Sequence, residues 1–166
     1  MTCYDDFPVR IVLLNLVELL GAMALGLVLV AQLGWWAVLT FAVVGCLGLI
    51  LSLAYGCTRC HYYGRVCGLG LGKIASLVFR KRDQSDFGKA LSQTVAWTLV
   101  GLTLALPPAT GLVSLTAGSG LLGLAQLGAF LALVFVIALT HSRFVCGHCR
   151  QARGRVCTLG RLAGRS

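Results

Sequence analysis

Long runs of apolar residues alternate with short polar segments along this chain of 166 residues. Four of the runs approach about 20 residues with almost no charge, which is the length needed to cross the ~30 Å hydrocarbon core of a bilayer. Because backbone polar groups in lipid must be satisfied within the segment itself, we expect helices rather than strands. The expected helices span about 11–31, 35–55, 94–113 and 121–140. The pattern predicts an all-α integral membrane protein with four transmembrane helices.

Composition agrees with that prediction and excludes an ordinary soluble domain. Hydrophobic residues make up 58% of the chain and charged residues 11%, and the mean hydropathy is +0.88. The first apolar run is longer than the hydrophobic region of a signal peptide, and the preceding "CYDDFPV" is acidic rather than basic. We therefore expect this run to be a retained helix.

The basic residues indicate an orientation in the membrane. All fourteen Lys and Arg residues precede the first run, separate the second from the third, or follow the fourth. The two other connections, 32–34 and 114–120, contain none. The positive-inside rule then places both termini and the middle connection in the cytoplasm, with the helices in a plasma or inner membrane. This topology and contact with anionic headgroups account for the net charge of +9 without nucleic-acid binding.

Two similar units follow one another along the chain. Each consists of a transmembrane hairpin and a cysteine motif, so the predicted divisions are 1–55, 56–91, 92–140 and 141–166. An even number of spans in each unit gives the two hairpins the same orientation, as in a parallel internal repeat. Within the second division, "KIASLVFRKR" (73–82) places apolar residues on one face between basic ones, which predicts a short amphipathic helix on the inner leaflet.

The cysteine motifs are the strongest chemical signal. "CTRCHYYGRVC" begins at Cys57 and "CGHCRQARGRVC" begins at Cys146, 89 residues later. Cytoplasmic thiols are normally kept reduced, which favours metal ligation over disulfides, and CxxC directs two thiolates at one metal. The candidate ligands are Cys57, Cys60, Cys67, Cys146, Cys149 and Cys157.

The spacings C-x2-C-x6-C and C-x2-C-x7-C resemble the two halves of the fungal binuclear zinc cluster. The resemblance covers only these motifs and carries no implication of DNA binding. It implies that six thiolates hold two zinc ions, with Cys57 and Cys146 bridging.

Other arrangements use the same residues. Cys57, Cys60, Cys146 and Cys149 alone can form one tetrahedral zinc site. Each motif can also hold its own metal, with a fourth ligand from a histidine. An iron–sulfur cluster and a thiol–disulfide redox pair stay open as alternatives to zinc. The candidate histidines are His61, His148 and His141.

One acidic residue, Glu18, lies inside a predicted span, and Asn15 precedes it by three residues on the same helix face. Ionisable residues within the membrane are costly and are candidates for function. The structural alternative is a protonated Glu18 that is hydrogen-bonded within the bundle, to Gln126 or Asn15.

These patterns favour an accessory, assembly or interaction subunit over an enzyme. The sequence offers no Ser–His–Asp or two-carboxylate set, and six thiolates would leave zinc no open position. The expected partners are the lipid bilayer and either another membrane protein or a second copy of the chain. The alternatives are handling or transport of a soft metal ion, for which Cys46 is the one cysteine within a span, and electron transfer through an iron–sulfur or dithiol centre.

Overall fold

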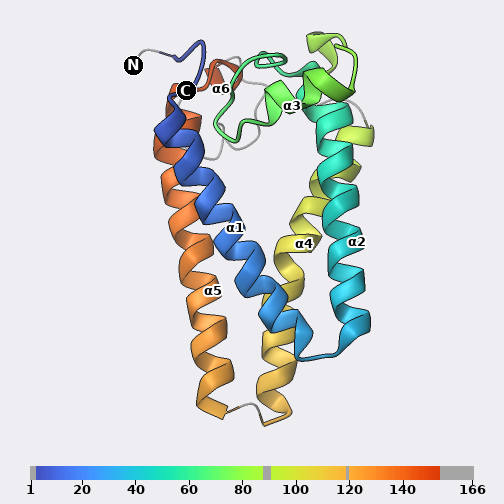
Figure 1. Cartoon of the computed structure of the whole chain (residues 1–166), viewed down its shortest axis with the longest axis vertical. Helices are drawn as coiled ribbons and strands as arrows, with labels where there is room; N and C mark the ends of the chain where they lie inside the picture. The colour runs from blue at the N-terminus through green and yellow to red at the C-terminus, as the bar shows by residue number, and fades with distance from the viewer. Residues whose placement is uncertain (1–2, 88–90, 119, 154–166) are drawn as a thin grey trace.

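The structure, a computed structural model, describes residues 3–87, 91–118 and 120–153. Within these ranges it is helical and contains no strand. Four long helices form an elongated bundle, and the shorter elements gather at one end of it (Figure 1). The helices are α1 (Val9–Ala31), α2 (Trp35–Leu51), α3 (Leu71–Val78), α4 (Leu91–Thr116), α5 (Gly120–Thr140) and α6 (Arg150–Arg153).

The predicted four spans are confirmed as helices long and apolar enough to cross a membrane. Including short extensions of α2 and α5, the apolar helical segments are Val9–Ala31, Trp35–Arg59, Gln93–Thr116 and Gly120–His148, with mean hydropathies of 2.3, 2.5, 1.5 and 2.5. α4 is helical through Pro107 and Pro108. The arrangement is that expected of an integral membrane protein.

Helices from the two halves of the chain pack against each other. α1 packs mainly on α5 and α4, and α2 packs mainly on α4. Within the described residues α2 and α5 lie on opposite flanks and make almost no contact (Figure 1). Each hairpin therefore buries its helices chiefly against the other hairpin.

Small residues allow these helices to approach closely, as is usual in membranes. Gly26 of α1 is the point where all four spans meet. A Cβ there would lie 3.0 Å from Pro107, 3.4 Å from Phe41 and 3.4 Å from Phe130. A Cβ on Gly48 of α2 would likewise lie 3.3 Å from the Val100 backbone nitrogen of α4. Larger side chains at either position would separate the helices.

The helices α2 and α5 end in the same way. A five-residue π-helix follows each of them, η1 (Ser52–Gly56) and η4 (His141–Val145). A 3-10 turn comes next, η2 (Cys57–Arg59) and η5 (Cys146–His148), and each turn is closed by the N–H of the second cysteine of CxxC. A further 3-10 turn, η3 (Gln84–Asp86), precedes α4.

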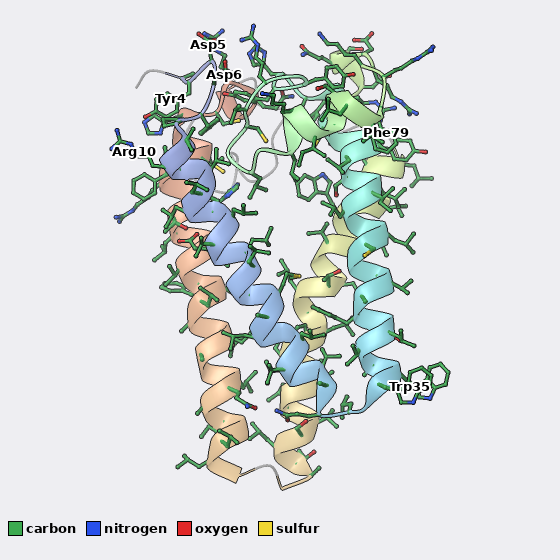
Figure 2. All side chains as sticks on the ribbon, in the orientation of Figure 1. Tyr4, Asp5, Asp6, Arg10, Trp35 and Phe79 are labelled. Atoms are coloured by element: carbon green, nitrogen blue, oxygen red, sulfur yellow. The ribbon has the colours of Figure 1, made fainter. Side chains whose placement is uncertain are left out.

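The far end of the bundle carries aromatic and amide side chains. Trp35 and Trp36 are exposed at the start of α2, with ring centroids 3.6 Å apart, and Trp35 lies at the end opposite Tyr4, Asp5 and Arg10 (Figure 2). The Gln32 amide donates to Gln126 Oε1 at 2.6 Å, joining α1 to α5 at this end.

Candidate functional site

Three segments remote in sequence meet at one end of the bundle, which we call the motif end. They are the N-terminal segment 3–8, the first cysteine motif with its following turn (57–72), and the second motif (146–151). The Tyr4 N–H donates to the His148 carbonyl at 3.1 Å, and the Phe7 N–H donates to the Val66 carbonyl at 2.9 Å. The N-terminal segment therefore bridges the two motifs.

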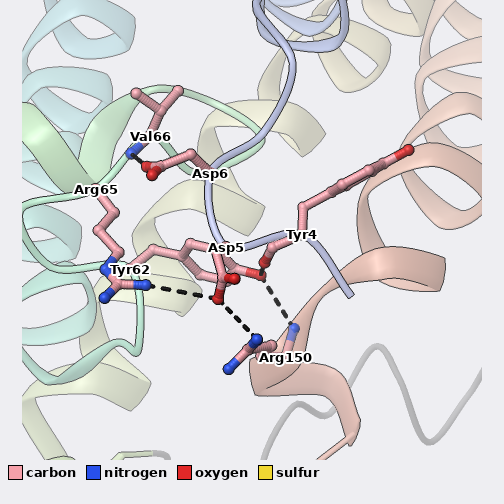
Figure 3. Close-up of polar contacts among 7 residues, drawn as sticks. All are labelled: Tyr4, Asp5, Asp6, Tyr62, Arg65, Val66 and Arg150. Atoms are coloured by element: carbon pink, nitrogen blue, oxygen red, sulfur yellow. Dashed lines mark hydrogen bonds and ion pairs between the residues drawn. The ribbon is translucent and has the colours of Figure 1, made fainter. Parts of the chain in front are cut away.

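Tyr62 is the centre of this assembly. Its side chain is 1% exposed, and its hydroxyl donates to the Tyr4 carbonyl at 2.9 Å while accepting from the Arg150 N–H at 3.1 Å (Figure 3). Burial raises the pKa of Tyr62 to about 12, the Arg150 N–H opposes that rise, and charge on Cys149, Cys3 and Cys60 would add to it. The hydroxyl therefore stays protonated and keeps its role as a donor.

Charged contacts surround Tyr62. The Asp5 carboxylate lies 2.7 Å from the Arg150 guanidinium and 3.6 Å from that of Arg65, so it joins the two motifs from outside (Figure 3). Asp6 accepts the Val66 N–H at 2.8 Å. The side chains of Asp5 and its arginines are about half exposed or more, so these ion pairs contribute less than the buried Tyr62 contacts.

The cysteines of both motifs lie around one apolar cluster. Phe7, Tyr62 and Val145 form its buried core, and half-buried Cys60, Cys67 and Cys149 pack against it. Cys57 lies within electrostatic reach of Cys60 and Cys67, and the Gly72 N–H donates to Cys67 Sγ at 3.4 Å. The structure thus brings thiols from both halves of the chain to the same cluster.

Two imidazoles of the motifs have a buried nitrogen with no hydrogen-bond partner, Nε2 of His61 and Nδ1 of His148. The His148 ring stacks on Tyr4, with centroids 4.9 Å apart, and the His61 N–H donates to Gln151 Oε1 at 3.0 Å. A buried ring nitrogen of this kind has lost its hydrogen bond to water, whether it acts as an acceptor or as a donor. It is therefore suited to bind a ligand.

Among the described candidate ligands, His141 lies away from this assembly. Cys157 lies outside the described residues. His141 lies with Asn15 in the membrane segment, its Nδ1 3.1 Å from Asn15 Oδ1. Within the described ranges, no three His, Cys, Asp or Glu side chains are close enough together to hold a metal ion.

Glycines permit the tight fit of the motif end. A Cβ on Gly68 would lie 2.5 Å from Val145 Cγ1, so the turn after the first motif presses directly on the second. A Cβ on Gly72 would collide with the Tyr62 carbonyl oxygen. The "GLGLG" sequence after Cys67 therefore serves close packing of backbone against backbone and side chain.

A second polar cluster lies within the membrane segments, between α1 and α5. The Thr140 hydroxyl donates to Glu18 Oε2 at 2.8 Å, and Asn15 donates through its side chain to the Ile11 carbonyl at 2.8 Å. Glu18 and Asn15 are 8% and 3% exposed. Both expected partners of Glu18 were wrong: its carboxyl group accepts from Thr140, whereas Asn15 contacts Ile11 and His141, and Gln126 bonds Gln32 at the far end of the bundle.

The aromatic and acidic residues of the N-terminal segment were missed from sequence. A signal was present, because "CYDDF" supplies two of the chain's five acidic residues on the same side of the predicted membrane as the basic residues. The negative charge of this segment favours its docking on the basic motifs. No sequence pattern indicates that Tyr62 is the residue that holds it.

No protein-family model matches the chain, and no curated protein or solved structure is significantly similar to it.

Proposed function

We propose that this chain is a membrane protein whose two hairpins form a parallel repeat and are joined at the cytoplasmic side by a cysteine-ligated metal centre. Zinc is the proposed metal, and the protein acts as an accessory or assembly subunit for another membrane protein. The observation that carries the proposal is the packing of Cys60 and Cys67 from one motif and Cys149 from the other around a single apolar cluster.

The backbone supports a common role for the two motifs. The same succession of α-helix, π-helix and 3-10 turn leads into both CxxC sequences, and the helix ends, the π-helices and the 3-10 turns are each displaced by 89 residues. The second cysteines leave their turns in similar extended conformations, with φ −77° and ψ 150° at Cys60 and φ −84° and ψ 123° at Cys149. Equivalent backbones would present equivalent thiols to one centre.

The donor set suits zinc. Thiolates and imidazoles are its preferred ligands, and the motifs offer both, including the unpartnered nitrogens of His61 and His148. Metal binding would require the thiols to move closer together, because the described side chains do not form a three-ligand group. A shell filled by thiolates leaves no position for substrate, which favours a structural role.

Orientation follows from charge. The described Lys and Arg residues lie in the first turn of α1, between α2 and α4, or after α5, and therefore on the motif side of the spans. The positive-inside rule makes this side cytoplasmic, where reduced thiols are available as ligands.

Elemental analysis and an absorption spectrum of anaerobically purified protein test the proposal. We expect colourless protein with about two zinc ions per chain, in the manner of closed thiolate sites. Cys57→Ser and Cys146→Ser should each lose the metal. Cys46→Ser is the matched control, because Cys46 is exposed on α2 away from the motifs. Brown protein that contains iron and sulfide would show an iron–sulfur centre in place of zinc. Metal-free protein would show that there is no metal centre.

The accessory role needs a test of its own. Crosslinking in native membranes should capture a defined membrane partner with the wild-type chain and much less of it with Cys146→Ser. Equal capture by the variant would separate partner binding from the cysteine centre.

One observation favours a second candidate function, transfer of a soft metal ion. The polar cluster of Glu18, Asn15, Thr140 and His141 lies at the start of η4, which leads directly into Cys146. Liposome uptake of zinc or cadmium that depends on Glu18 and on Cys146 would support transfer over a structural clamp.

A further inference from the structure

Two arginines converge on one tyrosine where the second span ends. The Arg59 guanidinium carbon lies 5.8 Å from the centre of the Tyr55 ring, and that of Arg82 lies 4.9 Å from the same centre. The segments are tied together by the Arg82 N–H, which donates to the Thr58 carbonyl at 3.0 Å. Two like charges are therefore held against a single aromatic ring.

Arg59 is unusual because it is only 9% exposed. Its Nη1 donates to the Tyr55 carbonyl at 3.0 Å, but its buried Nε has no partner. Among the described residues the ion pairs are those of Asp5 with Arg65 and Arg150, so no carboxylate neutralises Arg59. A buried charge without a counter-ion is strongly unfavourable.

The acidic residue that follows Arg82 in the sequence, Asp83, makes a hydrogen bond within its own turn. Asp83 accepts the Ser85 N–H at 3.0 Å and caps the η3 turn. That hydrogen bond lowers the pKa of Asp83, as expected for a carboxylate engaged with backbone donors. Among the described residues, no carboxylate forms an ion pair with Arg59 or Arg82.

We propose that Arg59 and Arg82 bind the phosphate group of an anionic phospholipid. Guanidinium groups match phosphate oxygens in charge and geometry, and basic sites at the ends of spans are suited to acidic headgroups. Arg59 ends the apolar segment Trp35–Arg59, which places the pair at headgroup level. The site consists of arginines and Tyr55 only, so it stands whether or not the cysteines bind metal.

The surroundings offer apolar surface for the acyl chains. α3 contacts both η1 and η2, and its Leu77 and Val78 are 81% and 67% exposed. A lipid whose phosphate lies on the arginines would cover such side chains with its hydrocarbon. A free phosphate ion shares the headgroup chemistry but would leave them uncovered.

Native mass spectrometry of the full chain in mild detergent, with phosphatidylglycerol or phosphatidylcholine added, tests the proposal. We expect preferential retention of phosphatidylglycerol, and an affinity about tenfold lower in Arg82→Gln, as for loss of one hydrogen-bonded charge contact. Arg80→Gln is the matched control, because Arg80 is exposed in the same segment. Its replacement removes the same charge as Arg82→Gln but does not change a contact with the Tyr55 ring. Arg82 is also exposed, so its replacement should leave the fold intact.

The second arm measures thermal stability in phosphate and in chloride at equal ionic strength. Stabilisation by phosphate without preference for phosphatidylglycerol would assign the site to a soluble phosphate and overturn the lipid assignment. Equal lipid binding by Arg82→Gln, Arg80→Gln and wild type would overturn the site itself.

Discussion

Replacement of Gly68 by alanine should loosen the contact between the two motifs. The new Cβ would lie 2.5 Å from Val145 Cγ1 and 2.8 Å from Cγ2, well inside van der Waals contact. Val145 is 8% exposed and packs with Phe7 and Tyr62, so it has little room to move away. Overpacking of this kind typically costs about 1–3 kcal/mol.

Removal of the obstructing methyl groups should reverse part of that loss. Val145→Ala alone loses buried apolar surface, at roughly 0.8 kcal/mol for each buried methylene or methyl group. In the double variant the alanine at 68 meets a smaller side chain, so the two effects should not add. We expect a coupling free energy of about 1 kcal/mol or more in favour of the double variant.

The assay is thermal unfolding of the detergent-solubilised chain, followed by circular dichroism for the four members of the cycle. A change of 1 kcal/mol should move the midpoint by about 2–4 °C for a chain of this size. Gly56→Ala is the control, because nothing lies within 4 Å of its added Cβ. Additive effects of the Gly68 and Val145 replacements would show that these residues are not in contact, and the docked arrangement of the motifs would be wrong.

Three further predictions concern polar contacts. Tyr62→Phe removes the buried hydroxyl that accepts the Arg150 N–H and donates to the Tyr4 carbonyl, and should lower stability by about 1–3 kcal/mol; a midpoint equal to that of wild type would remove Tyr62 from the centre of the assembly. Asp5→Asn should cost less than about 1 kcal/mol, with an effect that shrinks in high salt because the pairs are exposed; a salt-independent loss in unfolding experiments would contradict this. Glu18→Gln keeps an acceptor for the Thr140 hydroxyl and removes a buried ionisable group, so its unfolding midpoint should not fall. Glu18→Lys should unfold several degrees lower. An unchanged midpoint for the lysine variant in a detergent-based melting assay would argue against a buried Glu18.

Hydropathy was sufficient to predict the number of spans and, because two spans separate the cysteine motifs, that both motifs lie at the same end of the bundle. Length and absence of charge determine whether a segment can cross a bilayer, and both are local properties of sequence. The matching ends of α2 and α5 also follow locally, since related residues occupy related positions after each span.

The packing partners could not be predicted in the same way. In lipid a span is apolar on every face, so no amphipathic stripe reveals which side meets another helix. The pairing of Glu18 with Thr140 depends on the register of α1 against α5, which neither sequence segment contains alone. Tyr62 similarly becomes central only because Tyr4 and Arg150 are brought to it from both ends of the chain.

X-ray absorption at the zinc edge, on protein purified anaerobically without added metal, tests the central claim most directly. A centre built from both motifs predicts a first shell of sulfur at about 2.3 Å, with sulfur ligands lost in both Cys57→Ser and Cys146→Ser. A shell of oxygen and nitrogen alone, or a sulfur shell unchanged in either variant, would contradict a shared cysteine centre.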